Sequence, residues 1–267
     1  RALQYAATFG YTVWLRPQEL HLGQGVAASG PLATRLGLSG IPVAAETIAL
    51  HTIFDLLQAT GASVHLCRLS SGAGVELVRA AKARGLKVTC DVSINSLHLT
   101  DQDIGYFDSR ARLVPPLRQP HDRAALRAAL KDGTIDALVS DHNPVDEDAK
   151  TQPFAEAEPG ATGLELLLSL ALQWAQDDSV PLQRALAVVT SGPAAVLGNA
   201  LGTLQASVGR LVEGGVGDVC IVDPGVSWRA EPGALRSQGK HTPFSGGDLP
   251  ARVRCTLVGG QVAFDRA

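Results

Sequence analysis

The sequence predicts an α/β fold, a (β/α)8 TIM-type barrel followed by a small C-terminal all-β module. Short apolar strands alternate with amphipathic helices over the first two-thirds of the chain, as in a parallel sheet covered by helices. No GxGxxG motif opens a helix after a strand, which disfavours a nucleotide-binding sheet. The last part of the chain is rich in Gly and Pro and contains strand-like runs such as "GDVCIVDPG".

The predicted elements follow each other in barrel order. The chain opens on a helix that runs into a strand at 11–15, and further strands are expected at 63–67, 86–92 and 135–140. Ser70 or Ser71 is a suitable N-cap for the helix that follows the second of these strands, and Gly85 a suitable end. Helices are expected at 44–60, 75–84, 122–131, 163–176, 182–189 and 193–198.

Two domains are expected, namely the C-terminal part of a barrel over residues 1–200 and a small β module over residues 201–267. Four clear strands in roughly 200 residues fall short of a whole barrel, which takes about 250 residues. The chain has no methionine and opens inside a helix. We therefore expect the N-terminal part of the barrel to lie upstream of Arg1.

Composition excludes several classes of protein. With 45% hydrophobic and 18% charged residues the chain can bury a large core, so it is not a disordered protein. A net charge of −3 with scattered Lys and Arg indicates no nucleic-acid partner. The sequence contains no uninterrupted run of 18 apolar residues, so no membrane span is predicted. Four cysteines without metal-site spacing are interpreted as buried free thiols of a cytoplasmic protein, and Trp14 and Trp174 as core residues.

The chemistry of such a barrel is expected at the C-terminal ends of its strands. Arg16 follows the first strand and Arg68 follows the second, in "CRLS". Asn95 follows the third strand in "SINS", and Asp141 with His142 follows the fourth in "ALVSDHNPV". These are the candidate site residues that the pattern itself supplies.

Several longer motifs resemble the dihydroorotases of the amidohydrolase superfamily, in the class found as separate bacterial subunits. They occur in family order and spacing, and together they are specific: "RLGLSGIPVAAETIAL", "LSSGAGVELVRAAKARGLKVTCDV", "VPPLR", "DGTIDALVSDHNP", "PFAEAEPGATGLE" and "LGTLQASVGRLVEGGVGDVCIVDP". The resemblance implies a zinc site built from an HxH pair and an Asp upstream of residue 1, two histidines at later strand ends, and Asp141 as general base. Zinc would activate water and polarise the ring carbonyl.

The sequence departs from the family pattern at the positions that matter for catalysis. Arg16 and Arg68 stand where the family has its two strand-end histidines. A guanidinium has no accessible lone pair and is permanently charged, so it cannot ligate zinc. Val114 replaces the Asn of "NPPLR", Val145 replaces the last His of "DHAPH", and Asn95 stands in place of the first His of "PHH". We expect no metal or other cofactor here, and a degenerate site.

Asp141 therefore has two interpretations. It is a residual general base, or it is a carboxylate paired with Arg16 or Arg68, and we favour the second. His142 is expected to be a hydrogen-bonded structural residue, and His21 lies too far past its strand to be a displaced ligand. The remaining histidines share no spacing and are expected to decorate the fold: His51, His65, His98, His121 and His241.

Two functions remain open, and the first is favoured. The resemblance implies a non-catalytic dihydroorotase homologue that assembles with the aspartate transcarbamoylase catalytic subunit in pyrimidine synthesis. The alternative is an active zinc-dependent cyclic amidohydrolase, a dihydroorotase or, less favoured, an allantoinase. A third and weaker hypothesis is an anion pocket formed by Arg16 and Arg68. The sequence also leaves a homo-oligomer open.

Overall fold

A parallel sheet of four strands organises the computed structural model, which describes residues 1–266. The strands are β1 (Thr12–Leu15), β4 (Ser63–Leu69), β5 (Val88–Ser93) and β6 (Ala137–Val139), and they lie side by side in that order. Every neighbouring pair is parallel. The C-terminal ends of the strands therefore meet along one edge of the sheet, as the sequence predicts for the site.

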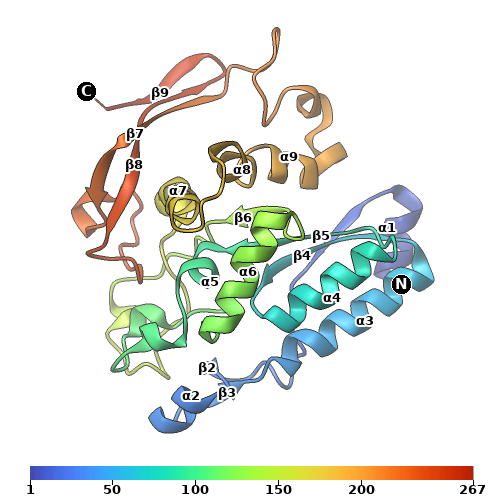
Figure 1. Ribbon diagram of the computed structural model, residues 1–267, viewed down its shortest axis with the longest axis vertical. Helices are drawn as coiled ribbons and strands as arrows, with labels where there is room; N and C mark the ends of the chain where they lie inside the picture. The colour runs from blue at the N-terminus through green and yellow to red at the C-terminus, as the bar shows by residue number, and fades with distance from the viewer. Residues whose placement is uncertain (267) are drawn as a thin grey trace.

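Helices connect the strands and cover one face of the sheet. Figure 1 shows α3 (Ala44–Thr60), α4 (Gly72–Ala83) and α6 (Pro120–Asp132) running along it, and α4 packs between the other two. The helix α3 has the predicted bounds, and Gly61 ends it in the left-handed conformation at φ 67°. Ser71 caps α4 by accepting a hydrogen bond from the Gly74 amide at 3.0 Å, so this helix begins three residues earlier than predicted.

Short elements fill the loops at the carboxyl edge, and three further helices follow β6. The short elements pack around a small second core that contains Ile104, Leu113 and Phe154. The helix α1 (Ala2–Phe9) precedes β1. The short elements are β2 (Ala27–Ala28), α2 (Pro31–Leu36), β3 (Gly40–Ile41), α5 (Ile94–His98) and 3-10 helices at Asp101–Ile104, Ser109–Ala111, Asp148–Lys150 and Leu164–Leu166. The helices after β6 are α7 (Leu167–Asp177), α8 (Leu182–Ala187) and α9 (Ser191–Leu197).

The C-terminal region is an antiparallel sheet of β7 (Val219–Arg229), β8 (Asp248–Val258) and β9 (Gln261–Asp265). It packs on α7, where the Trp228 indole donates to Ser169 Oγ at 3.1 Å and Ser169 Oγ donates to the Ala251 carbonyl at 3.1 Å. The main hydrophobic core continues from the parallel sheet through α7 into this sheet. The expected boundary at residue 200 stays a prediction.

The expected all-β module is present as this antiparallel sheet, but the region also contains two 3-10 helices. The strands β7 and β8 each have 11 residues, and 3-10 helices occur at Gly198–Ala206 and Pro232–Ala234. The strands β8 and β9 pair directly through a tight turn at Gly259 and Gly260, both with positive φ. Gly202, at φ 55°, kinks the first 3-10 segment.

Two predictions about buried residues also need correction. Trp174 is fully buried as expected, but Trp14 is 50% exposed because β1 lies at the edge of the sheet in the described residues. The four cysteines are free thiols within the described residues, yet only Cys90 is buried; Cys67 and Cys255 are partly buried and Cys220 is exposed. The exposure of these side chains depends on where each strand lies in its sheet, and an apolar run in the sequence does not reveal that position.

One stretch, Leu182–Ala206, is long and apolar enough to cross a membrane by length and composition, with a hydropathy of 1.4. In the structure it comprises α8, α9 and the following 3-10 segment, separated by non-helical backbone at Thr190, Gly198 and Gly202. A membrane-spanning helix needs about 20 residues without such breaks. The described fold therefore does not present this stretch as one spanning helix, and the expected cytoplasmic location stays a prediction.

Candidate functional site

A cavity of about 460 Å³ lies at the carboxyl ends of β1, β4 and β6. Five of the predicted site residues line it, namely Arg16, Arg68, Val114, Asp141 and His142. The other lining residues come from the segment between β5 and α6 and from the loop after β6, and none of them is acidic: Leu113, Asn143, Pro159, Gly160 and Ala161. The strand ends thus bring together two guanidinium groups and one carboxylate.

Arg68 enters the cavity through an irregularity of β4. The register with β5 shifts between Leu66 and Leu69, and Arg68 has a left-handed backbone at φ 59°. The Asp91 carboxylate of β5 accepts a hydrogen bond from the Arg68 amide at 2.7 Å. The register shift leaves this amide without a backbone partner on the neighbouring strand, and the carboxylate takes that place. A buried carboxylate on the next strand therefore holds the backbone that aims Arg68 into the site.

Arg68 and Asp141 form the central ion pair of the cavity. Arg68 Nη1 donates to Asp141 Oδ1 at 2.7 Å and to the Val114 carbonyl at 3.3 Å. The Arg68 side chain is 30% exposed and that of Asp141 is 10% exposed, so the pair is largely shielded from water. Asp141 also has a left-handed backbone, at φ 48°. Of the two predicted partners for Asp141, the structure selects Arg68.

Arg16 has no carboxylate within ion-pair distance among residues 1–266. Its Nη2 donates to the Gln18 amide oxygen, and Gln18 in turn donates to the Gly23 carbonyl at 3.1 Å. Burial lowers the pKa of Arg16, and the neighbouring Arg68 guanidinium lowers it further, while Asp141 acts in the opposite direction. Arg16 is thus a partly buried cation whose closest partner is neutral.

Three further predicted residues, Asn95, Val145 and His21, lie outside the cavity lining, and His142 in the lining is held by backbone hydrogen bonds. His142 Nδ1 accepts from the amides of Gly163 and Leu164 at 3.2 and 3.3 Å, which confirms a structural role for this imidazole. Asn95 is buried in α5 and does not line the cavity. Val145 is partly buried in the loop after β6, also outside the lining. His21 is exposed in its turn.

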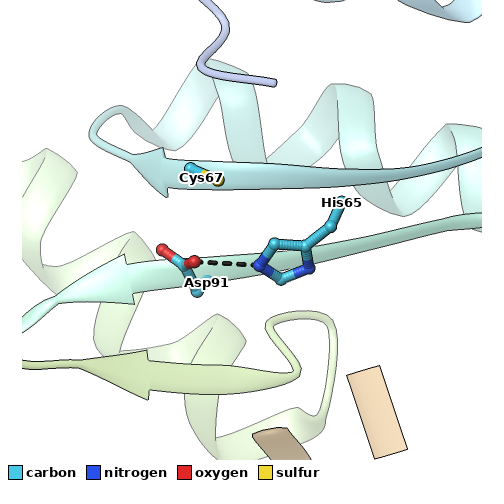
Figure 2. Close-up of side chains that lie close together, drawn as sticks. All are labelled: His65, Cys67 and Asp91. Atoms are coloured by element: carbon cyan, nitrogen blue, oxygen red, sulfur yellow. Dashed lines mark hydrogen bonds and ion pairs between the residues drawn. The ribbon is translucent and has the colours of Figure 1, made fainter. Parts of the chain in front are cut away.

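A second polar cluster lies in the sheet beneath Arg68 and was missed by the sequence reasoning. His65 Nε2 contacts Asp91 Oδ2 at 2.9 Å and His65 Nδ1 contacts Thr89 Oγ1 at 2.8 Å. Figure 2 shows this pair with Cys67 beside it on β4, and the ligand atoms of the three residues lie within 4.8 Å of one another. Both oxygens of Asp91 are already engaged, by His65 and by the Arg68 amide, so the cluster supports the strand end.

The sequence contains only part of the signal for this cluster, and the register between β4 and β5 supplies the rest. His65 and Cys67 are two residues apart on one strand and therefore point to the same face. Asp91 has the matching parity on the next strand, since His65 pairs with Thr89 in the register. Burial and, to a smaller extent, the Asp91 carboxylate raise the pKa of the Cys67 thiol to about 11 although Arg68 acts in the opposite direction, so Cys67 carries little thiolate at neutral pH.

A buried carboxylate anchors the turn behind the site. Glu46 Oε2 accepts from the Ser70 amide and hydroxyl at 2.8 and 2.7 Å, and Oε1 accepts from the Ser71 amide at 3.1 Å and from its hydroxyl. Arg118 Nε donates to Ser70 Oγ at 3.2 Å. Burial raises the pKa of Glu46 although these hydrogen bonds oppose the rise. Both oxygens of Glu46 are thus occupied, and the turn after β4 is fixed.

The strand-end residues do not fit a zinc ion. Zinc in proteins takes imidazole nitrogen, thiolate sulfur or carboxylate oxygen as ligands. At this cavity the described chain offers two guanidinium groups, which are cations without a donor lone pair, one carboxylate already bound by Arg68, and one imidazole, His142, whose Nδ1 already accepts from two backbone amides. No catalytic step that uses a metal can be derived from these residues.

Comparisons with known proteins agree with the motifs. The model of the amidohydrolase family matches residues 40–263. A dihydroorotase-like protein of Pseudomonas aeruginosa is 43% identical over 99% of this chain and 61% of its own length. A dihydroorotase of Geobacter sp. is 40% identical over 99% of this chain and 61% of its own. The chain thus spans about three-fifths of the length of the curated relatives that it matches.

Solved structures give the fold. An L-hydantoinase (dihydropyrimidinase) from Arthrobacter aurescens superposes with a TM-score of 0.87 at 24% identity, covering 99% of this chain and 59% of that one. A D-hydantoinase from Thermus sp. gives a TM-score of 0.84 at 21% identity, with the same coverage. At such identities the likeness concerns architecture alone. The predicted α/β barrel class with a C-terminal β sheet is confirmed.

Proposed function

Because the chain belongs to the amidohydrolase family, we propose that it is a dihydroorotase homologue without catalytic zinc, which serves as a structural subunit of an aspartate transcarbamoylase complex. The observation that carries the proposal is the ion pair between Arg68 and Asp141 at 2.7 Å. The guanidinium supplies the positive charge that a metal would otherwise place beside this carboxylate. Arg16 adds a second cation to the same cavity.

The engagement of Asp141 argues against a role as general base. A base must reach the proton that it removes, within about 3 Å or through one water. Arg68 takes one carboxylate oxygen, and only 10% of the Asp141 side chain is exposed. A water near the pair would therefore have to compete with Arg68 for the carboxylate that should accept its proton.

A structural role agrees with how the rest of the molecule is built. The core from β4 through α7 to β8 is well buried, with Leu50, Leu66 and Trp174 all fully inaccessible. Packing and catalysis are separable properties of a fold, so a site can decay while the framework that supports an interface persists. The partner, an aspartate transcarbamoylase catalytic subunit, is suggested by the family resemblance.

Zinc content and turnover test the loss of catalysis. The full-length protein, purified without chelators, is analysed for bound zinc and assayed for hydrolysis of dihydroorotate and allantoin. We expect well under one zinc per chain and no turnover. The double variant Arg16→His/Arg68→His serves as a comparison and should hold more zinc than the parent, because imidazole replaces guanidinium. Stoichiometric zinc with turnover in the parent protein would establish the active cyclic amidohydrolase instead.

A second experiment tests the partner. The full-length protein is mixed with the aspartate transcarbamoylase catalytic subunit of the same organism, and the mixture is analysed by size-exclusion chromatography with light scattering. We expect one complex of defined mass that contains both chains. Separate elution at concentrations well above the micromolar range would refute the structural role while leaving the loss of zinc intact.

A further inference from the structure

The cavity at the strand ends carries an excess of positive charge. Its charged lining residues are Arg16, Arg68 and Asp141, so two cations face one carboxylate and the formal sum is +1. Arg68 uses Nη1 for Asp141 and for the Val114 carbonyl, and its other guanidinium N–H groups have no hydrogen-bond partner within residues 1–266. The cavity therefore presents donors and charge that the described chain does not neutralise.

The nearest alternative anion is not available to Arg16. Glu46 lies behind the cavity and lines a small recess together with both arginines. Its two oxygens accept four hydrogen bonds from Ser70 and Ser71. Gln18, which does contact Arg16, is neutral. An anion beside Arg16 would offset both causes that lower the pKa of this residue, the repulsion from Arg68 and the cost of partial burial, because an opposite charge favours the protonated guanidinium.

From this arrangement we propose that Arg16 and Arg68 form a binding site for the oxyanion group of a small ligand, a carboxylate or a phosphate. Guanidinium groups bind both groups through paired N–H···O bonds, and partial burial strengthens such charge-assisted bonds. A cavity of about 460 Å³ has room for a metabolite of modest size. Val114 and the backbone near Gly160 form the walls that the remainder of the ligand would contact.

The inference rests on the zinc-free site of the proposed function, so its test begins by measuring zinc in the same sample. Binding of inorganic phosphate and of malonate to the full-length protein is then measured by calorimetry at constant ionic strength. We expect saturable binding of one anion per chain. Tighter binding of malonate would assign the site to carboxylates, and tighter binding of phosphate would assign it to phosphorylated ligands.

Two variants should move the affinity in opposite directions. Arg16→Gln removes the cation without a carboxylate partner and should weaken binding at least about tenfold. Asp141→Asn removes the internal competitor, raises the cavity charge to a formal +2, and should tighten binding several-fold. Arg84→Gln, which removes an exposed charge at the end of α4, is the matched control and should change affinity by less than about twofold.

The outcomes separate this inference from the proposed function. A zinc-free sample that binds neither anion, or binds them equally well with and without Arg16, overturns the anion site alone. A sample that holds stoichiometric zinc overturns both. Melting temperatures of all variants, measured in the same buffer, show whether each is folded; Asp141→Asn provides a gain in affinity that a merely damaged protein would not give.

Discussion

The contribution of the Arg68–Asp141 pair can be measured by a double-mutant cycle. The variants are Arg68→Gln, Asp141→Asn and the combination, which remove the charges while keeping similar side-chain size. Both positions have positive φ, at 59° and 48°. Asn is among the residues that adopt this conformation most readily, so Asp141→Asn changes the charge with little backbone cost. The Arg68→Gln change leaves the backbone preference of the residue nearly unaltered.

The expected coupling energy follows from the burial of the pair. Fully exposed pairs contribute less than about 1 kcal/mol. Removing one partner of a buried pair costs about 3–5 kcal/mol. With side chains 30% and 10% exposed and a contact of 2.7 Å, this pair lies between these limits. We expect a coupling energy of about 1–2 kcal/mol, and a loss of about 2–3 kcal/mol for Asp141→Asn alone, because Arg68 then remains partly buried beside Arg16.

Urea denaturation followed by far-ultraviolet circular dichroism gives the free energies of unfolding. The cycle is run at about 0.05 M and about 0.5 M salt, and the coupling should fall only modestly, since a shielded pair is screened less than an exposed one. The exposed pair Arg79–Asp132, with side chains 41% and 49% exposed, is the control and should couple by less than about 1 kcal/mol. A coupling below about 0.3 kcal/mol at Arg68–Asp141 would refute the reasoning, because distant independent sites give that value.

Three further predictions follow from buried groups. Glu46→Gln should lower the free energy of unfolding by about 2–4 kcal/mol, measured in urea, because the amide nitrogen cannot accept from the serine donors. His98 has its pKa lowered to about 4 by burial and by Arg127, so the unfolded chain binds more protons and stability should fall as pH drops from about 6.5 toward about 4, by about 3 kcal/mol. His98→Gln should remove this component of the pH dependence, whereas a variant of the exposed His121 should retain it. Iodoacetamide with mass spectrometry should label Cys220 first and Cys90 only after unfolding; early labelling of Cys90 would contradict its burial.

Much of the parallel sheet could be predicted because its signals are local. The strand preceding each site residue is an apolar run bounded by turn residues, and the helix at 44–60 ends at a glycine that permits left-handed backbone. The pairing of Asp141 with an arginine could also be predicted, since strand ends of a parallel sheet meet at one edge. Which of the two arginines, Arg16 or Arg68, pairs with Asp141 could not be predicted, because this depends on the direction in which each side chain leaves its strand.

The missed features depend on contacts between strands. The cluster of His65, Cys67 and Asp91 requires the register between β4 and β5, which a single sequence does not contain. The exposure of Trp14 depends on the edge position of β1. The register shift that turns Arg68 into the cavity is a change of one residue within an otherwise regular strand, below what periodicity can resolve.

The left-handed backbone at Arg68 and Asp141 sets which amino acids these two positions can accept. In a saturation library selected only for folding, Gly, Asn and Asp should be enriched at both sites, and Val, Ile and Thr depleted, since β-branched side chains resist positive φ. Such a library would separate demands of the main chain from demands of any ligand. If arginine is retained at position 68 in place of the residues that the backbone prefers, its frequency in the library measures how much the guanidinium contributes to folding.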